Sequence, residues 1–285
     1  MKTIAVLTDF SERAAHATRL AMNIAKKMKA NILLFSLSEV PAPNMQLAGA
    51  EPGYDGDDDN AGNAQALAEY ARNMNLDLKM KTFPGAFLPE ISYNSESTEM
   101  VDVMTAIVNN SNVALVVIPP DGDDLAAYML SPHCRRIIAW ANMPVLVVPE
   151  SAAIRNFEKI AFVTTLHPED ILSVTELGRL IEAFAAELMV AHLNEYPDDT
   201  GRIVAEKTMN NALCKNLDCN GVYFKSIRDD RPDKNWDWLK ANKKTELLAI
   251  VQQPADQMKK FFNRGRATHA THHITIPVMV LPKRP

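Results

Sequence analysis

Two apolar segments occur twice in the chain, at corresponding places in its two halves. Residues 4–11 read IAVLTDFS, and residues 160–167 repeat them as IAFVTTLH. Residues 143–149 read MPVLVVP and return at 276–282 as IPVMVLP. Such self-similarity indicates an internal duplication. Each half is therefore expected to begin and end with a buried strand.

Apolar runs alternate with helical patterns between these repeated segments. Strands alternating with helices predict parallel sheets with right-handed crossovers. We therefore expect an α/β fold of two tandem, doubly wound, Rossmann-like domains over residues 1–150 and 151–285, each a five-stranded parallel sheet flanked by helices. The predicted strands are 4–7, 32–37, 76–83, 113–118, 144–148, 160–164, 188–193, 221–227, 246–251 and 277–281. The predicted helices include 61–74, 95–109, 124–141, 200–217, 233–243 and 255–270, and residues 41–60 are predicted to be an irregular loop.

The charge of the chain excludes one class of partner. The net charge is −5. The first half carries 11 Lys and Arg against 18 Asp and Glu, and the second carries 19 against 17. Neither half is basic enough for a nucleic-acid binder. No apolar run is long enough for a membrane helix, and the N-terminus lacks a signal-peptide pattern. We expect a cytoplasmic protein whose three cysteines are reduced thiols.

The order of these elements resembles the universal stress protein family in its tandem two-domain form. The resemblance rests on VLTDFS at 6–11, LVVI at 115–118 and PVLVV at 144–148, and in the second half on residues 160–164 and 277–281. It implies a five-stranded parallel sheet between helices in each half. Many members pair their last strands, and in tandem members the two halves can pair in this way within one chain. Some members bind ATP and others do not.

The candidate ligand site of the first half lies where its strands end. In a doubly wound sheet, ligands bind at the carboxyl ends of the strands beside the switch point. This places the site near Thr8 and Asp9, residues 37–40 and residues 119–124. The resemblance implies that the acid after the first strand lies near an adenosine, and that a G-x-x-G-x9-G-[ST] segment after the fourth strand cradles phosphates. The candidate residues are Thr8, Asp9, Ser38, Pro119, Gly122 and Ser131.

The segment after the fourth strand departs from that phosphate cradle. It reads PPDGDD at 119–124, so Gly122 is its one glycine, and Pro120 has no N–H to donate. The three aspartates place negative charge where phosphates would lie. At ~5 Å and an effective dielectric constant near 20, each such contact costs about 3 kcal/mol before screening. Ser131 is the one remnant of the later Gly-[Ser/Thr] pair. The sequence therefore argues against phosphate-mediated ATP binding in the first half.

The second half departs in a different way. Thr165 stands where the first half has Asp9, and the segment after the fourth strand, QQPAD at 252–256, has no glycine. Further on, Arg264 and Arg266 are able to engage a phosphate or another anion. The alternative is a solvated basic turn, or a surface packed against the other half or a partner. Thr165, Arg264 and Arg266 complete the set of candidate ligand-binding residues.

Several other motifs are weaker. His269, His272 and His273 have spacings that suit a metal, but no further ligand stands nearby, so no metal site is expected. The acidic run at 55–60 lacks the Gly and Glu of a calcium loop and is interpreted as a flexible loop. No nucleophile elbow, Walker loop or G-x-G-x-x-G motif occurs, and no catalytic residue is assigned.

These observations favour a non-catalytic stress-response or regulatory module that needs no cofactor. The alternative is an adenine-nucleotide binding protein that takes ATP or AMP through an altered loop, with at most slow hydrolysis. An enzyme of the adenine nucleotide α-hydrolase-like group is a third and weaker interpretation. We expect the two domains to pair through their last strands. A homodimer or another protein is a further expected partner, and neither nucleic acid nor a membrane is expected.

Overall fold

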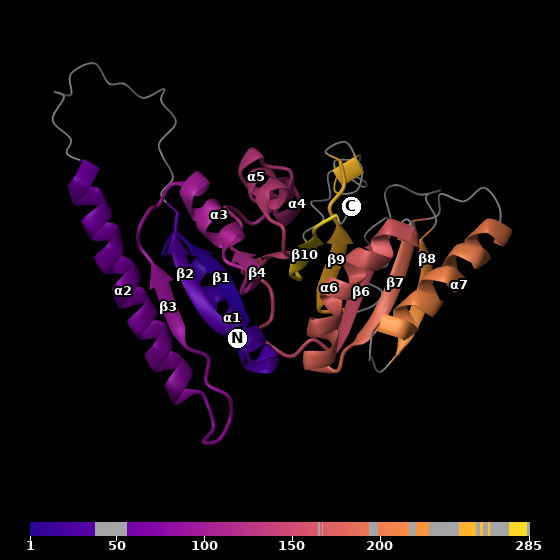
Figure 1. The fold of residues 1–285 in the computed structure, drawn as a ribbon, viewed down its shortest axis with the longest axis horizontal. Helices are drawn as coiled ribbons and strands as arrows, with labels where there is room; N and C mark the ends of the chain where they lie inside the picture. Colours follow the sequence, from indigo (N-terminus) through magenta and orange to yellow (C-terminus); the bar gives the residue numbers. More distant parts are fainter. Residues whose placement is uncertain are drawn as a thin grey trace, which may run out of the picture.

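The computed structural model describes residues 1–37, 56–164, 166, 168–193, 199–216, 221–227, 245–254, 257–258, 262 and 274–283. The described strands form one ten-stranded sheet with the order β3-β2-β1-β4-β5-β10-β9-β6-β7-β8. Figure 1 shows the strands of the first half at one end of this sheet and those of the second half at the other end. No helix in these described ranges is both long and apolar enough to cross a membrane.

The first half supplies five strands, and their neighbours pair in parallel. The strand order β3-β2-β1-β4-β5 places the switch point between β1 and β4. The elements are β1 (Thr3–Thr8), α1 (Glu12–Met28), β2 (Asn31–Ser36), α2 (Gly56–Met80), β3 (Ile91–Asn94), α3 (Met100–Asn109), β4 (Val113–Ile118), α4 (Leu125–Met129), α5 (Pro132–Trp140) and β5 (Val145–Val147).

The second half repeats that order as β8-β7-β6-β9-β10. Its described elements are β6 (Lys159–Thr164), α6 (Pro168–Phe184), β7 (Glu187–Leu193), α7 (Asp199–Asn216), β8 (Val222–Ile227), β9 (Leu247–Val251) and β10 (Val278–Leu281). The predicted α/β fold class, with parallel strands flanked by helices in each half, is confirmed. The helices predicted over 233–243 and 255–270 lie largely or wholly outside the described residues.

The two halves meet where β5 and β10 pair antiparallel, with Leu146 opposite Met279. Every other strand pairing described is parallel. Both strands at this junction are fully buried. A strand that is buried on both faces has apolar residues at nearly every position. This burial accounts for the repeated apolar segments at 143–149 and 276–282.

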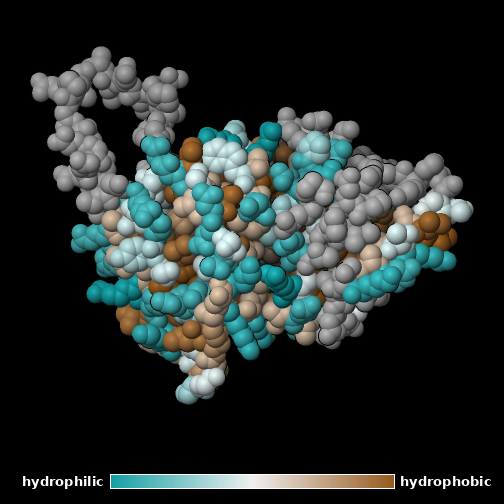
Figure 2. Space-filling model, in the orientation of Figure 1, coloured by the Kyte–Doolittle hydropathy of each residue, from teal (hydrophilic) through white to brown (hydrophobic). Residues whose placement is uncertain are grey.

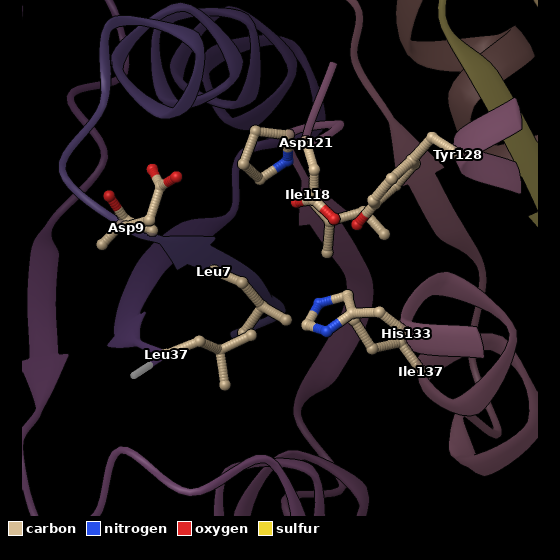
Figure 3. Close-up of a pocket in the computed structure, with 10 residues that line it drawn as sticks. Leu7, Asp9, Leu37, Ile118, Asp121, Tyr128, His133 and Ile137 are labelled. Carbon is tan, nitrogen blue, oxygen red and sulfur yellow. The ribbon is translucent and has the colours of Figure 1, made fainter. Parts of the chain in front are cut away.

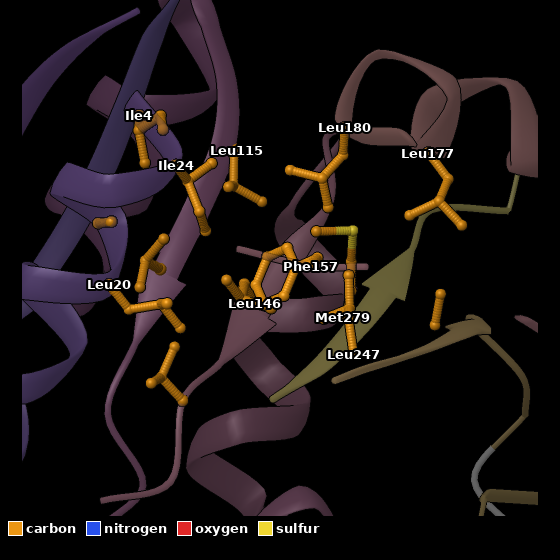
Figure 4. Close-up of a cluster of buried hydrophobic side chains, with 14 of the residues drawn as sticks. Ile4, Leu20, Ile24, Leu115, Leu146, Phe157, Leu177, Leu180, Leu247 and Met279 are labelled. Carbon is orange, nitrogen blue, oxygen red and sulfur yellow. The ribbon is translucent and has the colours of Figure 1, made fainter. Parts of the chain in front are cut away.

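The hydrophobic core has one layer on each face of the sheet. Helices α1, α2, α6 and α7 contribute side chains to one layer. Helices α3, α4 and α5 contribute to the other. Both layers include side chains from both halves, and Figure 4 shows the first one where the halves face each other. The sheet is therefore covered by helices on both faces.

The same turn follows the first strand of each half. The hydroxyl of Thr8 accepts a hydrogen bond from the backbone N–H of Phe10, and Thr164 does the same for Leu166. Phe10 and Leu166 both have a left-handed backbone, with φ of 64° and 62°. Such values are uncommon for residues other than glycine. The chain therefore takes the same conformation after the first strand of both halves.

Three local predictions in the first half are wrong. Residues 76–83 were predicted as a strand, but α2 continues to Met80 and the third strand is Ile91–Asn94. Leu76, Leu78 and Met80 alternate as in a strand, yet Leu78 alone of these three is buried. The helix predicted over 124–141 is broken between α4 and α5, because Ser131 and Pro132 begin a new helix. The acidic run at 55–60 is helical from Gly56 onward.

Candidate functional site

A pocket lies at the carboxyl ends of β1 and β4, beside the switch point (Figure 3). Its volume is about 40 Å³. Ligand pockets commonly measure roughly 300–1,000 Å³, so the described residues enclose much less space than a nucleotide requires. The pocket is lined by Leu7, Thr8, Asp9, Leu37, Ile118, Pro119, Asp121, Tyr128, His133 and Ile137.

The turn after β1 holds two of the predicted residues in place. Thr8 is buried, and its hydroxyl accepts the N–H of Phe10 at 3.0 Å. One carboxylate oxygen of Asp9 accepts the N–H of Ser11 at 2.9 Å. Ser11 in turn caps α1 by accepting the N–H of Ala14 at 3.1 Å. Asp9 therefore has a structural role at the helix start, and its side chain also faces the pocket.

Tyr70 of α2 packs against the turn after β1. Its hydroxyl lies 2.8 Å from that of Thr18, and its ring packs edge-on against Phe10 at 5.8 Å between centroids. Burial raises the pKa of Tyr70, while hydrogen bonds with the hydroxyls of Thr18 and Thr8 oppose that increase. The phenol is therefore neutral at physiological pH and acts as a packing and hydrogen-bonding group.

The aspartates after β4 are engaged by neighbouring protein groups. Arg13 of α1 donates to the backbone oxygen of Asp121 at 3.4 Å and to the carboxylate of Asp123 at 3.0 Å. Asp124 caps α4 by accepting the N–H of Ala127 at 3.0 Å. A Cβ at Gly122 would meet nothing within 4 Å, and the φ of Gly122 is not in the left-handed range. The loop is therefore held against α1, and its backbone does not require a glycine at position 122.

The structure brings together Thr8, Asp9 and Pro119 of the predicted residues. Gly122 and Ser131 are not among the described residues that line the pocket. Ser131 instead caps α5, where its hydroxyl accepts the N–H of Cys134 at 3.1 Å. Ser38, Thr165, Arg264 and Arg266 lie outside the described residues, as do the three histidines at 269–273.

Sequence reasoning missed the aromatic side of the pocket. Tyr128 of α4 and His133 of α5 lie with their ring centroids 6.4 Å apart. Figure 3 shows both side chains on the side of the pocket away from Asp9. The signal that was available is the Ser-Pro pair at 131–132, which starts α5 and turns His133 toward the strand ends. Cys134 beside them is buried, and burial raises the pKa of its thiol, which favours the protonated form.

The second half has a buried carboxylate that the sequence analysis also missed. Thr165 replaces the acid after the first strand, but Asp170 of α6 is 3% exposed and accepts a hydrogen bond from the hydroxyl of Thr164. On the neighbouring strand, the buried Nε2 of His192 lies 2.9 Å from a carboxylate oxygen of Glu206. Thr164 and His192 are register partners. Across the described parts of the chain, no group of three metal-ligating side chains comes together.

Comparison with known proteins identifies the family. The model of the universal stress protein family matches residues 1–149, which is more than half of the chain. The chain belongs to the universal stress protein family. The matched span contains the whole strand-end pocket described above. No curated protein matches the chain at a significant level.

Solved structures share the fold of this universal stress protein over nearly its full length. A universal stress protein from Archaeoglobus fulgidus DSM 4304 has a TM-score of 0.67 at 10% identity, and the alignment covers 99% of this chain and 96% of that one. The cytoplasmic domain of a prokaryotic cation chloride cotransporter has a TM-score of 0.53 at 11% identity, with the same two coverages. At such identities the likeness establishes the fold alone.

Proposed function

We propose that this universal stress protein is a non-catalytic regulatory module of the cytoplasm, and that its first half does not bind ATP through the phosphates. The observation that carries the proposal is the contact of Arg13 with the loop after β4. Arg13 is the cation nearest to that loop among the contacts described, and Asp121, Asp123 and Glu150 already engage it.

The chemistry of the loop supports the same conclusion. A phosphate cradle needs backbone N–H groups that point at the anion. Pro120 lacks this group, and the N–H of Ala127 is bound to Asp124. The carboxylate of Asp123 is largely exposed at the rim of the site. A triphosphate would therefore meet negative charge without the donors that could offset it.

Among the described residues near the pocket, the Ser, Cys and Thr side chains have structural roles, which supports a non-catalytic function. The thiol of Cys134 is held neutral by burial, and the hydroxyl of Ser131 serves as a helix cap. The hydroxyl of Thr8 is buried and accepts a backbone hydrogen bond inside a tight turn, which supports a structural role for this residue. The described residues around the pocket thus hold the turn and the helix starts in place. We infer that the protein acts through contacts with other proteins.

Calorimetric titration of the full chain with ATP, ADP and AMP in the presence of Mg²⁺ tests the proposal. The expected result is that Asp9→Ala leaves the heat of every titration unchanged, because no nucleotide occupies the pocket. Glu69→Ala is the matched control, since Glu69 is an exposed acid on α2. Micromolar ATP binding that Asp9→Ala weakens and Glu69→Ala does not would refute the proposal in favour of an adenine-nucleotide binding protein. Release of phosphate from ATP above that of buffer would refute the non-catalytic role.

A further inference from the structure

A second and larger cavity lies at the seam between the two halves. Its volume is about 460 Å³, within the range of roughly 300–1,000 Å³ for small-molecule sites. Helix α5 forms one wall, and the segment after β9 forms the other. This cavity shares no described lining residue with the strand-end pocket.

The wall formed by α5 carries two arginines for which no acidic partner is found among the described residues. Arg135 and Arg136 are exposed and line the cavity. Neither forms an ion pair within the part of the chain that the structure describes. The first half as a whole is acidic, so these two neighbouring guanidinium groups form a local positive site. A guanidinium group recognises phosphate through two parallel hydrogen bonds.

The same wall presents an aromatic face. Trp140 is 40% exposed and lines the cavity one helical turn from Arg136. The guanidinium carbon of Arg136 lies 5.3 Å from the centre of the indole ring. This contact holds the ring and the charge next to each other. An exposed tryptophan beside a guanidinium group can stack on a planar ring while the cation binds an attached anion.

The second half supplies amide groups on the opposite wall. Gln252 and Gln253 line the cavity and follow β9 directly. The backbone N–H of Gln252 donates to the carbonyl of Leu281 at 2.8 Å, which ties this wall to β10. Met258 adds a buried apolar contact at 8% exposure. Side-chain amides both donate and accept hydrogen bonds, and they can therefore satisfy the polar edge of an aromatic ring.

We propose that this cavity binds a small ligand in which a planar aromatic ring carries a phosphate group. In this arrangement Arg135 and Arg136 bind the phosphate, and Trp140 stacks on the ring. Gln252 and Gln253 contact the ring from the second half. A ligand held in this way touches both halves across the β5–β10 junction. The proposal is independent of the proposed function, which concerns the pocket at Asp9.

Phenyl phosphate is the probe, and the fluorescence of Trp140 is the readout. The chain has two other tryptophans, Trp236 and Trp238, so the assay uses a Trp236→Phe, Trp238→Phe background. Calorimetry on the unaltered chain is the second measurement and does not depend on that background. We expect phenyl phosphate to quench Trp140 and to release heat. Inorganic phosphate and phenol, which carry one part of the probe each, should bind at least tenfold more weakly, a ratio equivalent to about 1.4 kcal/mol.

Substitutions on both walls locate the binding. Arg135→Gln and Arg136→Gln should each weaken phenyl phosphate binding about tenfold or more, because each removes a charge-assisted hydrogen bond. Gln253→Glu should weaken it as well, by placing a negative charge on the second-half wall. Arg72→Gln is the matched control, since Arg72 is an exposed arginine of α2 far along the chain from this cavity.

Three results would overturn the proposal. The first is no binding of phenyl phosphate to the unaltered chain at millimolar concentration. The second is equal binding of inorganic phosphate, which would make the ring irrelevant. The third is an equal effect of Arg72→Gln and Arg136→Gln. None of them bears on the Asp9 pocket, which is tested by ATP and Asp9→Ala.

Discussion

Replacing Phe157 by alanine should destabilise the whole chain, because this side chain lies in the core that both halves share. Phe157 stands just before β6 and is 1% exposed. Its ring packs against that of Phe184 with centroids 4.9 Å apart. Figure 4 shows it in the middle of the cluster, where first-half side chains such as Leu146 face second-half ones such as Met279.

The expected cost follows from that burial. Truncation of a buried phenylalanine to alanine costs about 3–5 kcal/mol, which combines the lost transfer free energy with the cavity left behind. The lost aromatic pair with Phe184 favours the middle of that range, about 4 kcal/mol. Phe157→Leu keeps most of the volume and should cost about 1–1.5 kcal/mol. In a protein of this size, a loss of 4 kcal/mol lowers Tm by roughly 8–16 °C.

Urea unfolding followed by far-UV circular dichroism measures the free energy of unfolding. Ile154→Ala is the control, because Ile154 precedes the same strand but is 43% exposed, and it should cost about 0.5 kcal/mol or less. A loss below about 1 kcal/mol for Phe157→Ala, or one equal to that of Ile154→Ala, would refute the reasoning. A Phe157→Ala chain whose halves unfold in separate transitions would instead show that this residue couples them.

Two further predictions concern a buried thiol and a pair of helix ends. Burial raises the pKa of Cys134 above its ordinary value of 9.0, so the unfolded chain loses this proton at a lower pH than the folded one. Stability should therefore fall above pH 9.0, by at most about 1.4 kcal/mol per pH unit from this group, and Cys134→Ala should flatten that dependence in urea titrations at several pH values. Lys29 and Ala185 end α1 and α6 with φ of 51° and 50°, so Lys29→Gly and Ala185→Gly should each raise Tm through a gain of about 0.5–1 kcal/mol. Lys27→Gly inside α1 should instead lose about 1 kcal/mol, and a loss from both end substitutions would contradict the argument.

Much of the strand-end pocket could be predicted from the sequence. Thr8, Asp9 and Pro119 follow directly from strands that the apolar runs revealed, and strand ends on neighbouring strands must meet. Tyr128 and His133 were missed because the helical pattern over 124–141 looks continuous, although the chain breaks at Ser131. Asp170 was missed because the repeat aligns it with Ala14, an apolar residue that lies beyond the repeated segment 4–11.

The third strand shows how a local pattern can mislead. Alternating apolar residues at 76–80 predict a strand, because that spacing places them on one face of a sheet. Leu78 also continues the helical series that begins at Leu67 and Ala71, and all three side chains are buried on α2. Packing of α2 against β2 and β3 decided between the two patterns, and that contact involves residues far apart in the sequence.

The sequence by itself determined the alternation of strands and helices, the positions of most strands and the apolar character of those strands. These features follow from the order of apolar and polar residues along the chain, which reflects burial and the period of each element. The tertiary structure alone decided that Arg13 is bound to the loop after β4, and that Arg136 and Gln253 face one cavity. These contacts join residues more than 100 positions apart. Such pairings depend on how finished elements pack, and no local pattern of residues encodes them.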